Sequence, residues 1–122
     1  MISHQLDTDA GVLTVRPEGP LSGEDFKSLA AAVDPYIREF GSLKALIINV
    51  ESFPGWENFV GMIGHFKFVK GHHQDIGKVA LVTDSKLAGF MPKIVEHFVN
   101  ADIEVFPFGS LNEARDWVGQ KL

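Results

Sequence analysis

Ser52 occupies the position in the chain that best suits regulatory chemistry. It follows an apolar run that predicts a buried strand, and it precedes Pro54 and Gly55, after which a helical pattern begins near Trp56. Loops at the carboxyl ends of strands are where α/β sheets present functional residues. A phosphoryl group there would meet the backbone N–H groups of a helix start. The alternative is a turn serine that satisfies the local backbone. Ser52 is therefore a candidate phosphosite.

The other residues capable of acid–base or metal chemistry form no recognisable set. The chain has no cysteine, which excludes a disulfide and a thiol nucleophile, and its histidines lack the spacing of a zinc site. No phosphate-binding glycine loop is present, and the acidic pair Glu24 and Asp25 is typical of the first turn of a helix. We therefore expect no catalytic residue, no metal and no cofactor. The histidines are His4, His65, His72, His73 and His97.

Strand-like and helical patterns alternate along the chain. Strands are predicted at Ile2–Leu6, Val12–Arg16, Ala45–Val50, Lys78–Thr83 and Ile103–Phe106. Helices are predicted after Ser22 as far as Gly41, from near Trp56, from near Leu87, and after Ser110 through Val118.

Two of the predicted helices have the spacing of a capping box at their start. Ser22 with Asp25 opens the first helix, and Ser110 with Glu113 opens the last. Pro35 lies inside the first helix, and because proline cannot donate a backbone hydrogen bond, we expect a bend or break near Asp34.

The order of these patterns predicts one α/β domain spanning residues 1–122. A turn rich in aspartate joins the first two strands as an antiparallel hairpin, and helices separate the later strands, as in parallel βα units. The expected architecture is a single layer of mixed, mostly parallel sheet with about four helices. The chain has 122 residues, of which 45% are hydrophobic, so it is long enough for one core and is not disordered.

The overall charge and hydropathy limit the partners and the location of the protein. The net charge of −5 at pH 7 argues against nucleic acid as a partner. The chain has neither an apolar run of membrane-spanning length nor a basic leader segment. We therefore expect a cytoplasmic protein, with peripheral contact to the inner face of the membrane as an option.

Apolar rings and positive charge gather in the middle of this acidic chain. Residues 58–74 contain no acidic residue, and residues 65–98 carry five lysines against three acidic residues. Such a surface suits an anionic amphiphile or an anionic membrane; alternatively, the rings fill a phenylalanine-rich core and the lysines lie at its rim. The candidate binding residues are Trp56, Phe59, Met62, Phe66, Lys67, Phe68, Lys70, Phe90, Met91 and Lys93.

The order of elements and three motifs resemble the SpoIIAA-like proteins, small bacterial relatives of the STAS-domain fold that is also found in anti-sigma-factor antagonists. The motifs are Val50-Glu51-Ser52-Phe53-Pro54-Gly55-Trp56, Lys78-Val79-Ala80-Leu81-Val82, and Val105-Phe106-Pro107 with Asn112-Glu113-Ala114-Arg115-Asp116-Trp117. The resemblance implies helices packed largely on one face of the sheet. Antagonists carry an Asp-Ser-Ser-Gly junction whose serine a partner kinase phosphorylates, and here Ser52-Phe53-Pro54-Gly55 replaces it. The fold is also similar to that of lipid-binding CRAL-TRIO domains, which is an analogy of architecture alone.

These observations lead to two functional hypotheses. The first is a non-enzymatic binding or regulatory domain that holds a small apolar or amphiphilic anionic ligand, or touches a membrane, through the helices starting near Trp56 and Leu87. The alternative is a protein-interaction module of the anti-sigma-factor-antagonist type, regulated by phosphorylation at Ser52. A protein partner belongs to the second hypothesis, and a homo-oligomer is compatible with both.

Overall fold

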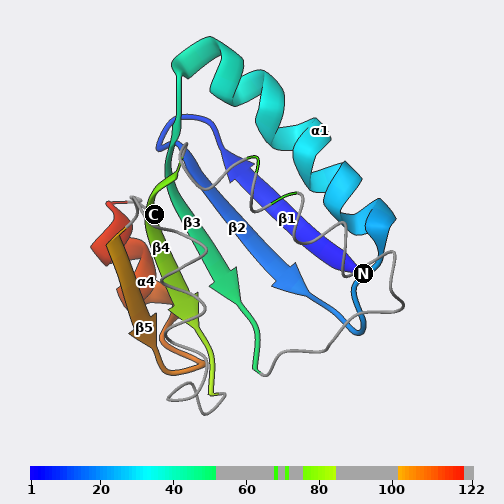
Figure 1. Ribbon diagram of the computed structural model, residues 1–122. Coiled ribbons are helices and arrows are strands. Elements are labelled where there is room, and N and C mark those ends of the chain that lie inside the picture. The colour runs from blue at the N-terminus through cyan, green and yellow to red at the C-terminus, as the bar shows by residue number, and fades with distance from the viewer. Residues whose placement is uncertain (52–67, 69–70, 72–75, 85–101, 120–122) are drawn as a thin grey trace.

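The computed structural model of the protein describes residues 1–51, 68, 71, 76–84 and 102–119 (Figure 1). Five strands and two helices run along these residues. The strands are β1 (Ile2–Asp7), β2 (Val12–Pro17), β3 (Leu43–Asn49), β4 (Ile76–Val82) and β5 (Asp102–Phe106). The helices are α1 (Gly23–Phe40) and α4 (Leu111–Val118).

The five strands form one mixed sheet in the order β1-β2-β3-β4-β5. Strands β1 and β2 are antiparallel, with Leu6 opposite Leu13, while β2, β3, β4 and β5 pair in parallel. Gly11 closes the hairpin with a φ of 72°, and its N–H donates to the Asp7 carbonyl at 2.8 Å. The predicted hairpin and the predicted mostly parallel sheet are confirmed.

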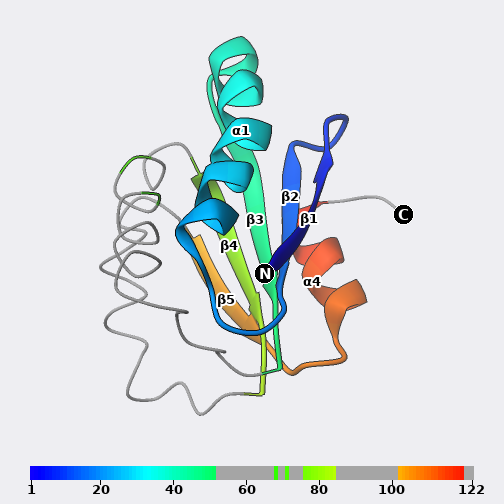
Figure 2. The ribbon, with the colours of Figure 1, turned by 90° about the vertical axis from the view of Figure 1, so that its right-hand side faces the viewer.

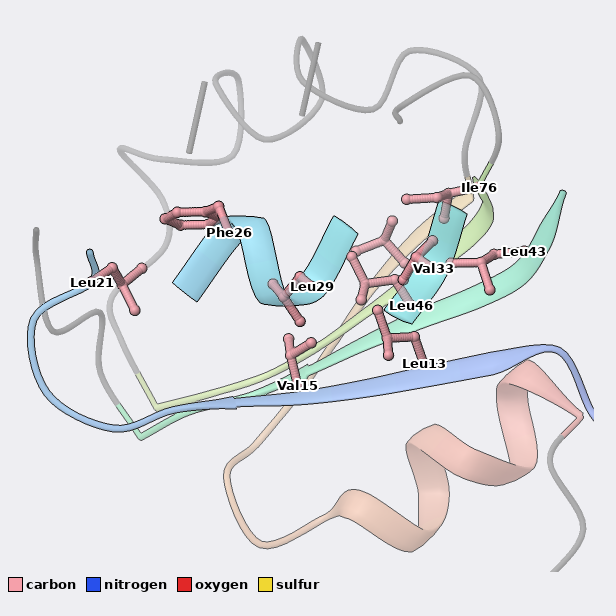
Figure 3. Packing of buried hydrophobic residues seen from close by; sticks show 10 residues of the cluster. Leu13, Val15, Leu21, Phe26, Leu29, Val33, Leu43, Leu46 and Ile76 are labelled. Atoms are coloured by element: carbon pink, nitrogen blue, oxygen red, sulfur yellow. The ribbon is translucent and has the colours of Figure 1, made fainter. Parts of the chain in front are cut away.

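Each face of the sheet has its own hydrophobic core, because successive side chains of a strand point to opposite faces. In β2, Leu13 belongs to the core under α1, whereas its neighbour Val12 belongs to the core under α4. Figure 3 shows the first of these, the α1-face cluster: Leu13, Val15, Leu21, Phe26, Leu29, Val33, Leu43, Leu46, Ile76 and Val79. The second, the α4-face cluster, comprises Val12, Ala45, Ile47, Ala80, Val82, Ala114 and Val118.

The two described helices therefore lie on opposite sides of the sheet (Figure 2). Both faces of β3 and β4 carry buried apolar side chains, so both need cover. The expectation that helices pack largely on one face stays a prediction, because two of the predicted helices lie outside the described residues. Of about four helices expected, two are found in the described part of the chain. The helices predicted near Trp56 and Leu87 lie outside it.

Helix α1 begins at the predicted capping box. The Ser22 hydroxyl accepts from the Asp25 N–H at 3.3 Å, and the Asp25 carboxylate accepts from the Ser22 N–H at 2.8 Å. The helix then continues through Pro35 to Phe40, so the predicted break is absent. Pro35 has no N–H to donate to the carbonyl of Ala31, four residues earlier. Both residues are exposed, so water can donate to that carbonyl instead.

Helix α4 starts without the predicted capping box. Ser110 has φ −100° and ψ 35°, and its side chain makes no capping hydrogen bond. A capping serine needs an extended backbone, whereas the Ser110 N–H closes a turn by donating to the Pro107 carbonyl at 3.0 Å. The tight connection from β5 thus determines the conformation of this residue.

Candidate functional site

The carboxyl ends of the parallel strands bring four chain segments to one edge of the sheet, which we call the carboxyl edge (Figure 1). Its described segments are 18–22, which connects β2 to α1, 50–51 after β3, 83–84 after β4, and 107–110 between β5 and α4. This is the edge at which open α/β sheets bind their ligands and partners. Ser52 follows directly in the sequence after the second of these segments.

Backbone hydrogen bonds continue beyond the strands and hold this edge together. The Val50 N–H donates to the Val82 carbonyl at 3.0 Å, and the Thr83 N–H donates to the Phe106 carbonyl at 2.9 Å. The Asp84 N–H donates to the Glu51 carbonyl at 3.1 Å. The ends of β3, β4 and β5 are therefore tied to one another past the last regular pair.

Thr83 fixes the peptide that leads into Ser52. Its hydroxyl donates to the Glu51 carbonyl at 3.0 Å, and the residue is only 6% exposed. The Glu51 carbonyl thus accepts two hydrogen bonds, one from the Thr83 side chain and one from the Asp84 backbone. Because a buried hydrogen bond restrains both groups, the chain leaves β3 in a defined direction.

Asp84 orders the next segment and helps to display an aromatic ring. Its carboxylate accepts from the Phe108 N–H at 3.0 Å. Phe108 lies in the turn that Ser110 closes, in which Gly109 has a φ of 103° that suits glycine. Phe108 is 42% exposed although its N–H is bonded to Asp84 and the turn around it is closed by the Ser110 N–H. An ordered, exposed aromatic side chain is the kind of residue that anchors protein interfaces.

The described carboxyl edge is acidic at its surface. Glu18, Glu51 and Asp84 are exposed there. Asp25 lies at the same edge but is largely covered, with 14% of its side chain exposed, and it also pairs with the N-terminal ammonium group at 3.2 Å. Burial alone would raise the pKa of Asp25. Hydrogen bonds from Ser22 and from the ammonium group lower it by more, so the pKa falls below its ordinary value of 3.8.

One of the ten predicted ligand- or membrane-binding residues belongs to the described part of the chain. Phe68 is helical and half-buried, and it packs against the α1-face cluster with its ring centroid 6.2 Å from that of Phe26. Its ring therefore contributes to the core under α1. The other nine residues lie outside the described ranges, as does Ser52.

Thr83, Asp84 and Phe108 were not predicted as site residues from the sequence. Their roles depend on contacts between segments 24 and 32 residues apart, which local patterns do not reveal. One signal was present, because a threonine and an aspartate directly follow a buried strand.

The described residues offer no metal site, since they include no group of three or more His, Cys, Asp or Glu side chains that could hold an ion. His4, the histidine that the structure describes, is exposed on β1. Within the same ranges, neither helix is long and apolar enough to cross a membrane.

The mixed sheet and its ordered carboxyl edge define a small α/β domain whose parallel strands end at a candidate interaction edge. The family model described as SpoIIAA-like matches residues 12–119. The chain therefore belongs to the SpoIIAA-like family. Comparisons with curated proteins and with solved structures found no match.

Proposed function

We propose that this protein is a regulatory protein-interaction module of the anti-sigma-factor-antagonist type. The observation that carries the proposal is the SpoIIAA-like match over residues 12–119, which includes the whole parallel part of the sheet and its carboxyl edge. The partner-binding surface is the carboxyl edge, where Phe108 offers an ordered apolar contact. The role is one of binding and release, without catalysis by this chain.

Phosphorylation of Ser52 would control binding through charge. Ser52 directly follows Glu51 in the sequence, and the Glu51 carbonyl is held by Thr83 and Asp84. A phosphoryl group adds a charge of about −1.5 to −2 at neutral pH. It would join the carboxylates of Glu51 and Asp84 on an edge that is already acidic. A partner that tolerates the unmodified edge would therefore bind the phosphorylated form less tightly.

The test is phosphorylation by anti-sigma kinases from the same bacterium. The protein is incubated with each kinase and ATP, and intact mass and peptide mapping locate any phosphate. We expect one phosphate on Ser52, its loss in Ser52→Ala, and its retention in Ser42→Ala, which removes an exposed serine from the opposite edge of the sheet. We also expect Ser52→Glu to weaken kinase binding by roughly tenfold. An unmodified Ser52 with every kinase would end the proposal.

Ligand or membrane binding has less support from the described residues. Phe68 packs on Phe26 in the core, where its ring is partly withdrawn from any ligand. The remaining candidates, including Lys67, Lys70 and Lys93, lie outside the described ranges, so the hypothesis stays a prediction. Native mass spectrometry of freshly purified protein decides it, because a retained small molecule would add to the mass of the chain.

A further inference from the structure

The α4 side of the sheet changes from apolar to polar beyond the helix. In β2, Thr14 and Arg16 follow Val12 on this face, and in β1 their directly opposite partners are Gln5 and Ser3. We call these four residues, Ser3, Gln5, Thr14 and Arg16, the polar strip. Helix α4 packs mainly on β3, β4 and β5, and β2 and β1 continue the same face of the sheet on one side of it (Figure 2). Of the strip residues, Thr14 is buried.

Arg115 lies on the flank of α4 that faces this strip. Ala114 and Val118 point down into the α4-face cluster, and Trp117 leans toward the other side, with its ring 6.0 Å from Phe106 of β5. Lys78 of β4 also contacts the Trp117 ring, at 5.0 Å. At about 100° per residue, Arg115 is about 200° from Trp117 around the helix axis. Arg115 therefore projects from the β2 side of α4.

The guanidinium group of Arg115 has a hydrogen-bonding defect. Its Nε atom is buried and has no hydrogen-bond partner. A buried donor without an acceptor costs about 1–3 kcal/mol, and more when the group is charged. One explanation for such a group in a native fold is that a bound ligand supplies the missing acceptor.

The surroundings of the two arginines favour an anionic acceptor. Among the described residues, neither Arg16 nor Arg115 forms an ion pair. The other strip residues are neutral hydrogen-bonding side chains, and Asn49 continues the row on β3. The acidic residue on this face of the hairpin is Asp7, whose carboxylate accepts the N–H groups of Asp9 and Ala10 at the far end. Of the three arginines of a chain with net charge −5, Arg16 thus belongs to the polar strip and Arg115 to the flank of α4 that faces it.

We propose that Arg115 and Arg16, across the polar strip, bind an oxyanion: a phosphate or carboxylate group of a small ligand. The planar guanidinium presents several donors in a fork that matches both groups. The ligand oxygen would accept from the buried Arg115 Nε–H, and the exposed Gln5 amide would supply a neutral hydrogen bond, whereas the Ser3 hydroxyl already donates to the Arg16 carbonyl at 3.4 Å and Thr14 is buried. The site uses neither Ser52 nor any residue of the carboxyl-edge segments, although Arg16 is two residues from Glu18, so its test is separate from that of the proposed function.

The chain is well suited to a direct test because it contains three arginines, Arg16, Arg38 and Arg115. Their Nε–Hε groups give three side-chain signals in ¹H–¹⁵N NMR spectra, which Arg→Lys variants assign. Inorganic phosphate or acetate is titrated at constant ionic strength. We expect saturable shifts of the Arg115 and Arg16 signals, with the Arg115 proton moving downfield, and no shift of Arg38, which is exposed on α1. The anion that saturates at lower concentration identifies the ligand class.

Affinity measurements on variants add a second readout. Arg115→Lys keeps the charge but loses the forked donors, so we expect affinity for the anion to fall about tenfold. Arg38→Lys is the matched control and should leave affinity unchanged. If Arg115→Lys does not fold, Arg16→Lys and the titration of the native chain decide. Absence of any saturable shift, or equal shifts of all three signals, which would indicate an adventitious ion only, would overturn the proposal.

Discussion

Asp25 connects three backbone groups near the start of the chain. Its carboxylate accepts from the N–H groups of Ser22 and Ile2, at 2.8 and 3.2 Å, and pairs with the N-terminal ammonium group. It therefore joins the start of α1 to the start of β1 at the carboxyl edge. Each of these contacts is stronger when the group is ionised, which is why its pKa is lowered.

Replacement of Asp25 by Asn should destabilise the fold by about 1–2 kcal/mol, because it weakens the capping box and removes the charge. Since the pKa of Asp25 is lowered on folding, its ionised form stabilises the native state above pH 3.8, and this contribution is lost as the pH falls through the lowered pKa. The difference between native protein and Asp25→Asn in urea unfolding should thus be large at pH 6 and shrink as the pH falls below 3.8.

Glu24→Gln is the control for this experiment. Glu24 is exposed and pairs with exposed Lys27 at 3.4 Å, so its replacement should change stability by less than about 0.5 kcal/mol. An effect of Asp25→Asn that stays equal at both pH values would show that charge is not the cause.

At the scale of elements, α1 shows how a helix absorbs a locally unfavourable residue. Pro35 cannot donate to the Ala31 carbonyl, and the helix nevertheless runs from Gly23 to Phe40. Its buried side chains, Phe26, Leu29 and Val33, all precede the proline and hold the first half against the sheet. Tertiary packing therefore outweighs the local cost.

Pro35→Ala should stabilise the protein by about 1–2 kcal/mol. Alanine restores the hydrogen bond and removes the ring clash, gains that outweigh the added entropy of the unfolded chain. Thermal and urea unfolding measure the effect. Ala31→Gly, one turn earlier on the same exposed face, should instead cost about 1 kcal/mol. If Pro35→Ala is instead less stable than the native protein, the missing hydrogen bond and the ring clash are not the main effects of Pro35 on α1.

At the scale of the whole molecule, the central strands have apolar cores on both sides. Leu13 is 1% exposed under α1, and its neighbour Val12 is fully buried under α4. We expect Leu13→Ala to destabilise the protein by about 2–5 kcal/mol, because it leaves a cavity at the centre of the α1-face cluster.

Phe40→Ala provides the contrast for Leu13→Ala. This ring is 59% exposed at the end of α1, with Tyr36 as its ring contact at 4.6 Å. Its removal should cost less than about 1 kcal/mol in the same urea unfolding assay. Equal losses for the two variants would show that the α1-face cluster is not the principal core.

Much of the fold could be predicted from the sequence. All five strands were predicted within about two residues of their observed ends. The Ser22–Asp25 capping box was predicted to the residue, because the motif is local. The prediction of a capping box at Ser110 was wrong, because the turn closed by the hydrogen bond from Ser110 to Pro107 sets the backbone conformation of Ser110. For the candidate site, the predicted strand before Ser52 was enough to indicate that this serine follows the carboxyl end of a parallel strand.

The amino-acid sequence by itself determined the five strands and two helices of the described residues, the hairpin and the membership of the SpoIIAA-like family, since these depend on local periodicity, capping and motif order. Only the tertiary structure decided that α1 and α4 cover opposite faces, that Thr83 and Asp84 hold the peptide before Ser52, and that the Arg115 Nε atom is buried without a hydrogen-bond partner. The physical reason is sequence separation. These contacts join groups on different strands and helices, and their positions are set by how the elements pack.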